Sequence, residues 1–242
     1  MSKSLRNDTA GTRPATSGRW LIACFAVAAA AMPAALGDDY LAGLLVQAML
    51  FGMVALLTDI IWGYAGILSF ASAAMFGVGA YFLGGVFVHL SSTPENVFLA
   101  AAAAAVTVFV ASAGIGWLAF YSRTEVSDFY IAVVTLGLSV LLGQAILYGG
   151  ALTGGSNGLS GFPTLGMPNK VWYAGVVALF FVTIAIATTI VRSDFGLVLK
   201  AIRDNEMRCR YLGIDTPLMR TMVFSLTNAV IAIIGVVYAT FT

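Results

Sequence analysis

The richest polar chemistry in this sequence lies in the stretch RSDFGLVLKAIRDNEMRCRYLGIDTPLMR, at residues 192–220. Its basic residues alternate with acids, a pattern that suits ion pairs and docking onto a protein better than binding to anionic lipid. Ser193 or Asp194 can cap the start of a helix, and Gly213 with Pro217 can end it. The apolar face of such a helix would hold Leu199, Ile202, Cys209 and Leu212. The alternative is a basic loop that only fixes membrane topology.

A second candidate for chemistry is the glycine-rich stretch GALTGGSNGLSGFP, at residues 150–163. A phosphate-binding loop needs glycines that lead into a helix, with a lysine and a hydroxyl in place, and this stretch has no lysine. The nucleotide-binding pattern GxxxxGK[ST] occurs nowhere in the chain. Glycine, asparagine and proline at this density instead favour a tight turn. We expect the turn residues to be Thr153, Gly154, Gly155, Asn157 and Gly158.

The composition points to a membrane protein and excludes several classes of function. Hydrophobic residues make up 60% of the 242 residues and charged residues only 10%, with a mean hydropathy of +0.94. The net charge of +1 provides no basic surface for nucleic acid. One histidine and two distant cysteines, Cys24 and Cys209, cannot supply a zinc site or a disulfide framework. Paired acids within the apolar segments are also missing, so we expect neither an enzyme nor a cofactor.

The hydropathy pattern predicts an all-α, polytopic membrane protein with about seven transmembrane helices, because a spanning helix needs about 20 apolar residues. The candidate segments cover residues 20–37, 41–61, 63–90, 97–121, 129–149, 171–191 and 221–242.

The distribution of Lys and Arg predicts the orientation. If residues 1–19 form a cytoplasmic tail, alternation through the transmembrane domain, 20–242, places every Lys and Arg except Lys170 inside. The stretch 192–220 then faces the cytoplasm, and the glycine-rich loop, 150–170, faces outward. The alternative for the first segment is a cleaved signal peptide.

The third segment, 63–90, is too long for one perpendicular crossing and is rich in glycine. Two interpretations stay open. A tilted helix could pack closely through small residues, as at Ala80 and Gly84. Alternatively, the helix is interrupted or re-entrant, which would bring Ser69, Ser72 and nearby backbone groups beside a polar path.

Polar residues within the predicted spans are candidates for a transport path. Each of them could instead satisfy its own helix backbone or join neighbouring helices. The candidates are Ser69, Ser72, Thr135, Ser139, Gln144 and Asn228. No acidic residue lies convincingly at mid-membrane, which argues against a proton-coupled carrier.

Three stretches, in order, resemble one family. AIRDNEMRCRYLGID is similar to the cytoplasmic coupling segment of ABC importer permeases of the branched-chain amino acid type, often called LivM-like. DFYIAVVTLGLSVLLGQAILYGGALTGGSNGLSGFP resembles a span of that family with its following loop, and GYAGILSFASAAMFGVGAY resembles its glycine-rich early span. The matches cover roughly residues 60–239. Urea and short-chain amide permeases are close relatives of this family.

The resemblance implies a non-catalytic permease subunit in a bacterial inner membrane. Its partners would be a second permease subunit, with a heterodimer expected, two ATP-binding subunits, an extracytoplasmic solute-binding protein and membrane lipid. Glu206 and Gly213 would carry the coupling motif, and Arg203 and Arg210 would add contacts with the ATPase. The glycine-rich loop would serve as a gate or as a docking surface for the binding protein.

The sequence also departs from the family pattern. Many relatives have a histidine after the "LS" of the early span, whereas this chain reads Ser69, Phe70, Ala71, Ser72. Relatives continue beyond the position of Thr242, so we expect a fragment or a truncated product. The substrate class stays open between branched-chain or other amino acids and urea or amides. A passive channel or ion-coupled carrier is the alternative from another class.

Overall fold

The computed structural model describes residues 39–89, 93–121, 128–150, 153–159 and 166–242. These ranges contain helices and no strands. The elements are α2 (Asp39–Asp59), the π-helix η1 (Ile60–Tyr64), α3 (Ser72–His89), α4 (Pro94–Phe120), α5 (Asp128–Tyr148), the 3-10 turn η3 (Gly155–Asn157), α6 (Asn169–Arg192), α7 (Asp194–Asp204), α8 (Glu206–Tyr211) and α9 (Thr216–Phe241). The predicted segment 20–37 lies outside the described residues.

Within the described ranges, five helices are long and apolar enough to cross a membrane. They are Tyr40–Tyr64, Pro94–Phe120, Phe129–Tyr148, Asn169–Arg192 and Thr216–Phe241. The apolar helix Ser72–Val88 is shorter, because the predicted third segment is not helical from residue 65 to residue 71. The chain is a multi-pass, all-α membrane protein, which confirms the predicted fold class.

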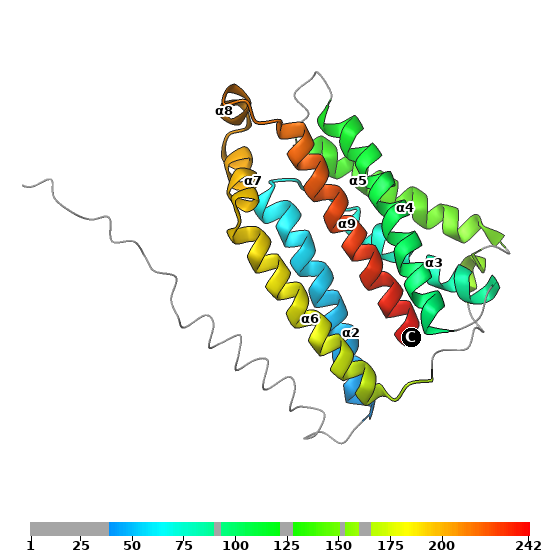
Figure 1. Ribbon diagram of the computed structural model, residues 1–242. Coiled ribbons are helices and arrows are strands. Elements are labelled where there is room, and N and C mark those ends of the chain that lie inside the picture. Colours follow the sequence, from blue (N-terminus) through cyan, green and yellow to red (C-terminus); the bar gives the residue numbers. More distant parts are fainter. Residues whose placement is uncertain (1–38, 90–92, 122–127, 151–152, 160–165) are drawn as a thin grey trace, which may run out of the picture.

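The helices run alternately between two ends of the bundle (Figure 1). Helices α7 and α8 lie at one end, called here the α8 end, and α9 descends from it to the opposite end. Helices α2, α4 and α6 finish at the α8 end, and α5 begins there. The stretch 192–220 therefore lies at the α8 end, whereas α5 runs away from that end toward the loop that follows it.

Helix α9 is the centre of the bundle. In its membrane-length window 61% of the residues are buried, against 39% or less in each of the other spanning helices. Glycines allow α3 to cross it at short range, since a Cβ at Gly79 would overlap the carbonyl oxygen of Ala232, and one at Gly235 would overlap that of Phe76. The close packing expected of the glycine-rich segment is therefore present, at a contact between backbones.

The interruption considered for the same segment is present as well. After η1 the chain leaves helical geometry, and residues 65–71, called here the broken segment, precede α3. Gly66 has a φ of 68°, a left-handed conformation that favours glycine. Such backbone is tolerated at membrane depth only where protein or water covers it. In this chain Ala65, Ile67 and Ala71 are fully buried.

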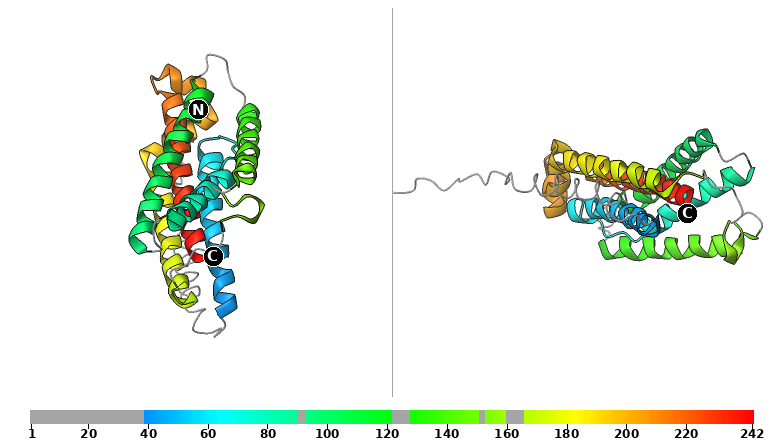
Figure 2. Two further views of the ribbon diagram at one scale, coloured as in Figure 1. Left: turned by 90° about the vertical axis from the view of Figure 1, so that its right-hand side faces the viewer. Right: turned by 90° about the horizontal axis from the view of Figure 1, so that it is seen from below.

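Helix α4 packs on α9 through a stripe that repeats every fourth residue. Its buried members are Ala100, Ala104, Val108, Ser112, Gly116 and Phe120. This spacing keeps them on one face of the helix. By contrast, α5 lies at the periphery of the bundle (Figure 2), with only 17% of its window buried.

Candidate functional site

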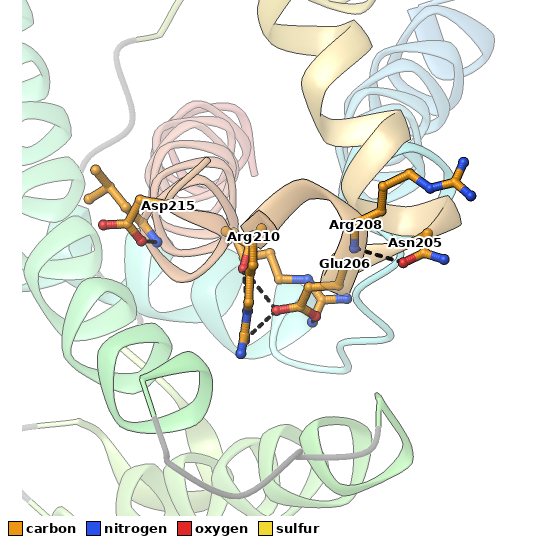
Figure 3. Close-up of polar contacts among 8 residues, drawn as sticks. Asn205, Glu206, Arg208, Arg210 and Asp215 are labelled. Atoms are coloured by element: carbon orange, nitrogen blue, oxygen red, sulfur yellow. Dashed lines mark hydrogen bonds and ion pairs between the residues drawn. The ribbon is translucent and has the colours of Figure 1, made fainter. Parts of the chain in front are cut away.

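The polar stretch at the α8 end forms two helices, and the expected single helix is wrong. Asn205 lies between them with extended backbone, φ −160° and ψ 94°. Its side-chain oxygen accepts a hydrogen bond from the Arg208 N–H at 2.9 Å, which caps α8 (Figure 3). Asn is a strong N-cap residue because its side chain can replace the missing backbone acceptor. The break turns α8 away from the axis of α7.

The two helices bury only part of the predicted apolar face. Ser193 caps α7, because its hydroxyl accepts from the Gly196 N–H, as expected from the sequence. Leu199, Ile202 and Cys209 are buried, but Leu212 is 74% exposed. The placement of Leu212 on the buried face was wrong, since the change of direction at Asn205 breaks the helical register.

Gly213 marks the end of α8, as predicted from the ease with which glycine adopts a positive φ after the last turn of a helix. Its φ is 84°, and its N–H donates to the Arg210 carbonyl at 3.0 Å, while the Ile214 N–H donates to the Cys209 carbonyl at 3.1 Å. These two bonds form a Schellman motif, which satisfies the last carbonyls of a helix. Asp215 then accepts from the Leu218 N–H and caps α9. The hairpin from α7 to α9 therefore has a defined course.

Glu206 is the hub of an ion cluster that joins α8 to α9 (Figure 3). One carboxylate oxygen accepts from Arg210 at 2.6 Å and from the Thr216 hydroxyl at 3.0 Å. The other oxygen lies 3.0 Å from the Arg220 guanidinium, whose side chain is only 10% exposed. Arg220 also lies over the Phe120 ring of α4, at 5.7 Å. Glu206 and Arg210 are thus brought together, with their shared contacts directed toward α9.

Arg203 contacts a different part of the molecule. Its guanidinium donates to the Gly63 carbonyl in η1 and pairs with Asp204 at 3.2 Å. The hydrogen bonds and ion pairs of the Glu206 cluster do not involve Arg203. The predicted coupling residues therefore share the α8 end, but they attach to two different elements.

The outer face of α8 carries apolar side chains that the described chain leaves uncovered. Met207 is 44% exposed, Tyr211 83% and Leu212 74%. Arg208 is also exposed on this short helix. Apolar side chains gathered at an exposed helix are typical of a surface that binds another protein.

Four of the predicted path residues lie close to Phe70 in the broken segment. The Phe70 N–H donates to the Thr135 hydroxyl at 3.1 Å, and the Ser139 hydroxyl donates to the Phe70 carbonyl at 2.8 Å. Ser69 accepts from the Ala71 N–H at 3.2 Å. Ser72, the first residue of α3, is buried, and its hydroxyl has no hydrogen-bond partner among the described residues. The tertiary structure therefore assembles these hydroxyls around non-helical backbone.

The other two path candidates lie elsewhere. Gln144 is exposed in the last turns of α5. Asn228 is fully buried in α9, and neither atom of its amide has a partner within the described ranges. The structure gives no contact between either residue and the Phe70 region.

Of the glycine-rich loop, 150–170, the structure describes residues 150, 153–159 and 166–170. The Thr153 hydroxyl donates to the Ile146 carbonyl at 2.6 Å, which caps the end of α5. Gly154, Gly155 and Gly158 all have positive φ, so the prediction of a tight turn is confirmed. Leu159 then packs onto α3, where a Cβ on Gly84 would lie 2.7 Å from its Cδ1. Asn157 is exposed.

Several important residues were not predicted from the sequence. Asn205 offered a signal, because Asn followed by Glu can begin a helix. Thr216, Arg220 and Gly66 offered none, because their roles depend on partners that are distant in the chain. Among the described residues, no three His, Cys, Asp or Glu side chains converge to hold a metal ion.

Residues 40–242 match the family described as "Branched-chain amino acid transport system / permease component". The chain belongs to this family. The resemblance found in the three sequence stretches is thereby confirmed, and the chain is a transport permease component by family.

Curated relatives carry the same description in their names. The high-affinity branched-chain amino acid transport system permease protein LivM of Salmonella typhimurium is 23% identical over 220 residues, which cover 79% of this chain and 50% of the relative. A probable LivM permease of Methanocaldococcus jannaschii is 25% identical over 239 residues, 84% of this chain and 68% of the relative. LivM of Escherichia coli is 22% identical, with 79% and 50% covered. The chain spans about half the length of the two bacterial relatives. No solved structure matches it.

Proposed function

We propose that this chain is a membrane-spanning permease subunit of an ABC importer for branched-chain or other amino acids, driven by separate ATP-binding subunits. Family membership and the names of the relatives support the substrate class. The absence of GxxxxGK[ST] from the sequence supports the division of labour, since the chain carries no nucleotide loop of this type.

The observation that carries the proposal is the exposed apolar face of α8. Met207, Tyr211 and Leu212 project from a short helix whose start is capped by Asn205 and whose end is set by Gly213. The Glu206 cluster anchors this helix to α9. A rigid apolar surface loses little conformational entropy on binding, so it suits docking into a groove of an ATPase subunit.

The remaining parts of the proposed complex are assigned by the charge pattern and the family resemblance. The α8 end would be cytoplasmic, because nearly all Lys and Arg residues then face inward, and the N-terminus would lie on the cytoplasmic side of the bacterial inner membrane. A second permease subunit would complete the path. Residues 153–159 would lie at the outer mouth, where a solute-binding protein delivers substrate. The hydroxyls around Phe70 would border the path.

The test of docking uses the affinity-tagged chain expressed with the ATPase and permease genes adjacent to its own. Tyr211→Ser with Leu212→Ser should abolish retention of the ATPase subunits on the tag, because polar groups replace the apolar contact. Leu197→Ser is the matched control, since Leu197 is 60% exposed on α7 rather than α8. Equal retention by all variants would contradict the proposed surface.

The test of substrate uses cells that express the complete set of adjacent genes. Radiolabelled leucine should accumulate in an ATP-dependent way and radiolabelled urea should not. Uptake of urea without leucine would move the chain to the amide-permease class.

A further inference from the structure

The broken segment is fastened at its beginning by α7. The Arg203 guanidinium donates to the Gly63 carbonyl at the end of η1. The stem of the same side chain lies against Gly66, where an added Cβ would be 2.6 Å from the Arg203 Cγ. One turn earlier in α7, the Lys200 ammonium lies 5.9 Å from the centroid of the Tyr64 ring. Helix α7 therefore contacts both backbone and side-chain atoms at the end of η1 and the start of the broken segment.

The same segment is fastened near its other end by α5. Both backbone polar groups of Phe70 are bound by hydroxyls of that helix, the N–H by Thr135 and the carbonyl by Ser139. Thr135 is 1% exposed and also donates to the Ile131 carbonyl at 2.8 Å. The Thr135 hydroxyl therefore donates its proton within α5 and accepts from the Phe70 N–H through its oxygen, so its role toward Phe70 is that of an acceptor.

These attachments matter because residues 67–70 make no helical backbone hydrogen bonds within the described part of the chain. The last such bond before them runs from the Gly66 N–H to the Trp62 carbonyl, and the next from the Met75 N–H to the Ala71 carbonyl. Backbone groups in a membrane protein must find partners within the protein, and here side chains on α7 and α5 supply several of them. The path of the segment is therefore set by two helices that are distant from it in the chain. A shift of either helix changes the partners available to Gly63 or Phe70.

We propose that the broken segment is a mechanical link between α7 and α5, and that Arg203 is a positioning residue inside the permease rather than a contact with the ATPase. The proposal rests on the proposed function, because a docked partner on α8 supplies the displacement of the α7–α8 hairpin. That displacement passes through Arg203 to Gly63 and Gly66, along the segment to Phe70, and then to Thr135 and Ser139 on α5. Helix α5 can respond because it lies at the periphery of the bundle, whereas α9 is held at its centre.

The experiment measures the position of α5 relative to α9 in the complex with ATPase subunits, reconstituted in lipid. Spin labels are placed through Leu141→Cys on α5 and Leu226→Cys on α9, both exposed positions, with Cys24 and Cys209 replaced by alanine. In the parent protein, addition of ATP should shift the distance between the labels. Arg203→Met should abolish this shift while the ATPase subunits stay bound. Arg192→Met, at an exposed arginine that ends α6, is the matched control and should preserve the shift.

A second variant tests the far end of the link. Thr135→Val with Ser139→Ala removes the hydroxyls that bind Phe70, at a site within the membrane span where no ATPase can dock. The same loss of the ATP-dependent shift, with ATPase binding unchanged, is expected. Thr188→Val with Thr189→Val is the control, since those hydroxyls donate only to the Ala185 carbonyl of their own helix.

The outcomes separate the two proposals. Loss of ATPase binding in Arg203→Met would make Arg203 a docking residue and overturn the link. A normal shift in either the Arg203 or the Thr135 and Ser139 variant would also overturn it. If the parent chain retains no ATPase, the proposed function fails, and the link fails with it.

Discussion

Removal of the Glu206 charge should detach α8 from α9. In Glu206→Gln the amide keeps the shape of the side chain, but the Arg220 guanidinium, 10% exposed, loses the carboxylate that lies 3.0 Å away. Breaking a buried pair costs about 3–5 kcal/mol, whereas an exposed pair is worth about 1 kcal/mol or less. Because Glu206 is 26% exposed and Arg210 45%, both pairs are partly screened. We expect a loss of about 2–3 kcal/mol.

Thermal unfolding in detergent measures this loss. For a chain of this size, about 2–3 kcal/mol corresponds to a fall in Tm of roughly 4–12 °C. Asp204→Asn is the matched control, since Asp204 is 67% exposed and pairs with a half-exposed Arg203. Its Tm should fall by no more than about 2 °C, because a surface pair contributes little.

A double-mutant cycle with Arg220→Met tests whether the effect passes through the pair. After Glu206→Gln, the further change at Arg220 should cost less than it does alone, because the ion pair between Glu206 and Arg220 is already broken. Equal losses in Glu206→Gln and Asp204→Asn, or strict additivity in the cycle, would refute the reasoning. A drop in transport-coupled ATPase activity in Glu206→Gln would then have to arise at a docking contact.

Two further predictions concern packing within the membrane. Gly79→Ala should lower Tm, with a loss of about 1–3 kcal/mol in the free energy of unfolding, because the added Cβ would overlap the Ala232 carbonyl. Gly77→Ala is the control and should be neutral or stabilising, because its Cβ would meet nothing within 4 Å. Equal effects of the two changes would exclude the close crossing of α3 and α9. Asn228→Leu should raise Tm, because it removes a buried amide that has no partner among the described residues. A fall in leucine uptake despite this higher Tm would assign Asn228 to the transport path.

Much of the fold follows from local sequence properties. Spanning helices were predicted because runs of about 20 apolar residues have one stable state in lipid. Among the described helices their ends shifted by only a few residues, except at α3, which begins at Ser72 rather than 63, and at α9, which begins at Thr216 rather than 221. The cap at Ser193 and the stop at Gly213 were also predictable, because caps depend on residues within one turn of each other.

The candidate site was predictable only in part, because its contacts join residues far apart in the chain. The sequence singled out Glu206 and Arg210 as coupling residues through the family resemblance. It did not predict that they pair with each other, or that the buried Arg220 joins Glu206 to α9. It left open whether residues 63–90 formed a packed or an interrupted helix, and the structure contains both features.

By itself, then, the sequence determined the membrane class, most of the spans and the turns, since composition and short-range patterns are sufficient for these, while the family came from the resemblance of three stretches. Only the tertiary structure decided that Arg203 contacts Gly63 and that Thr135 and Ser139 bind Phe70. The physical reason is that the backbone of residues 67–70 lacks the hydrogen bonds of a regular helix, so its partners come from whichever helices pack beside it.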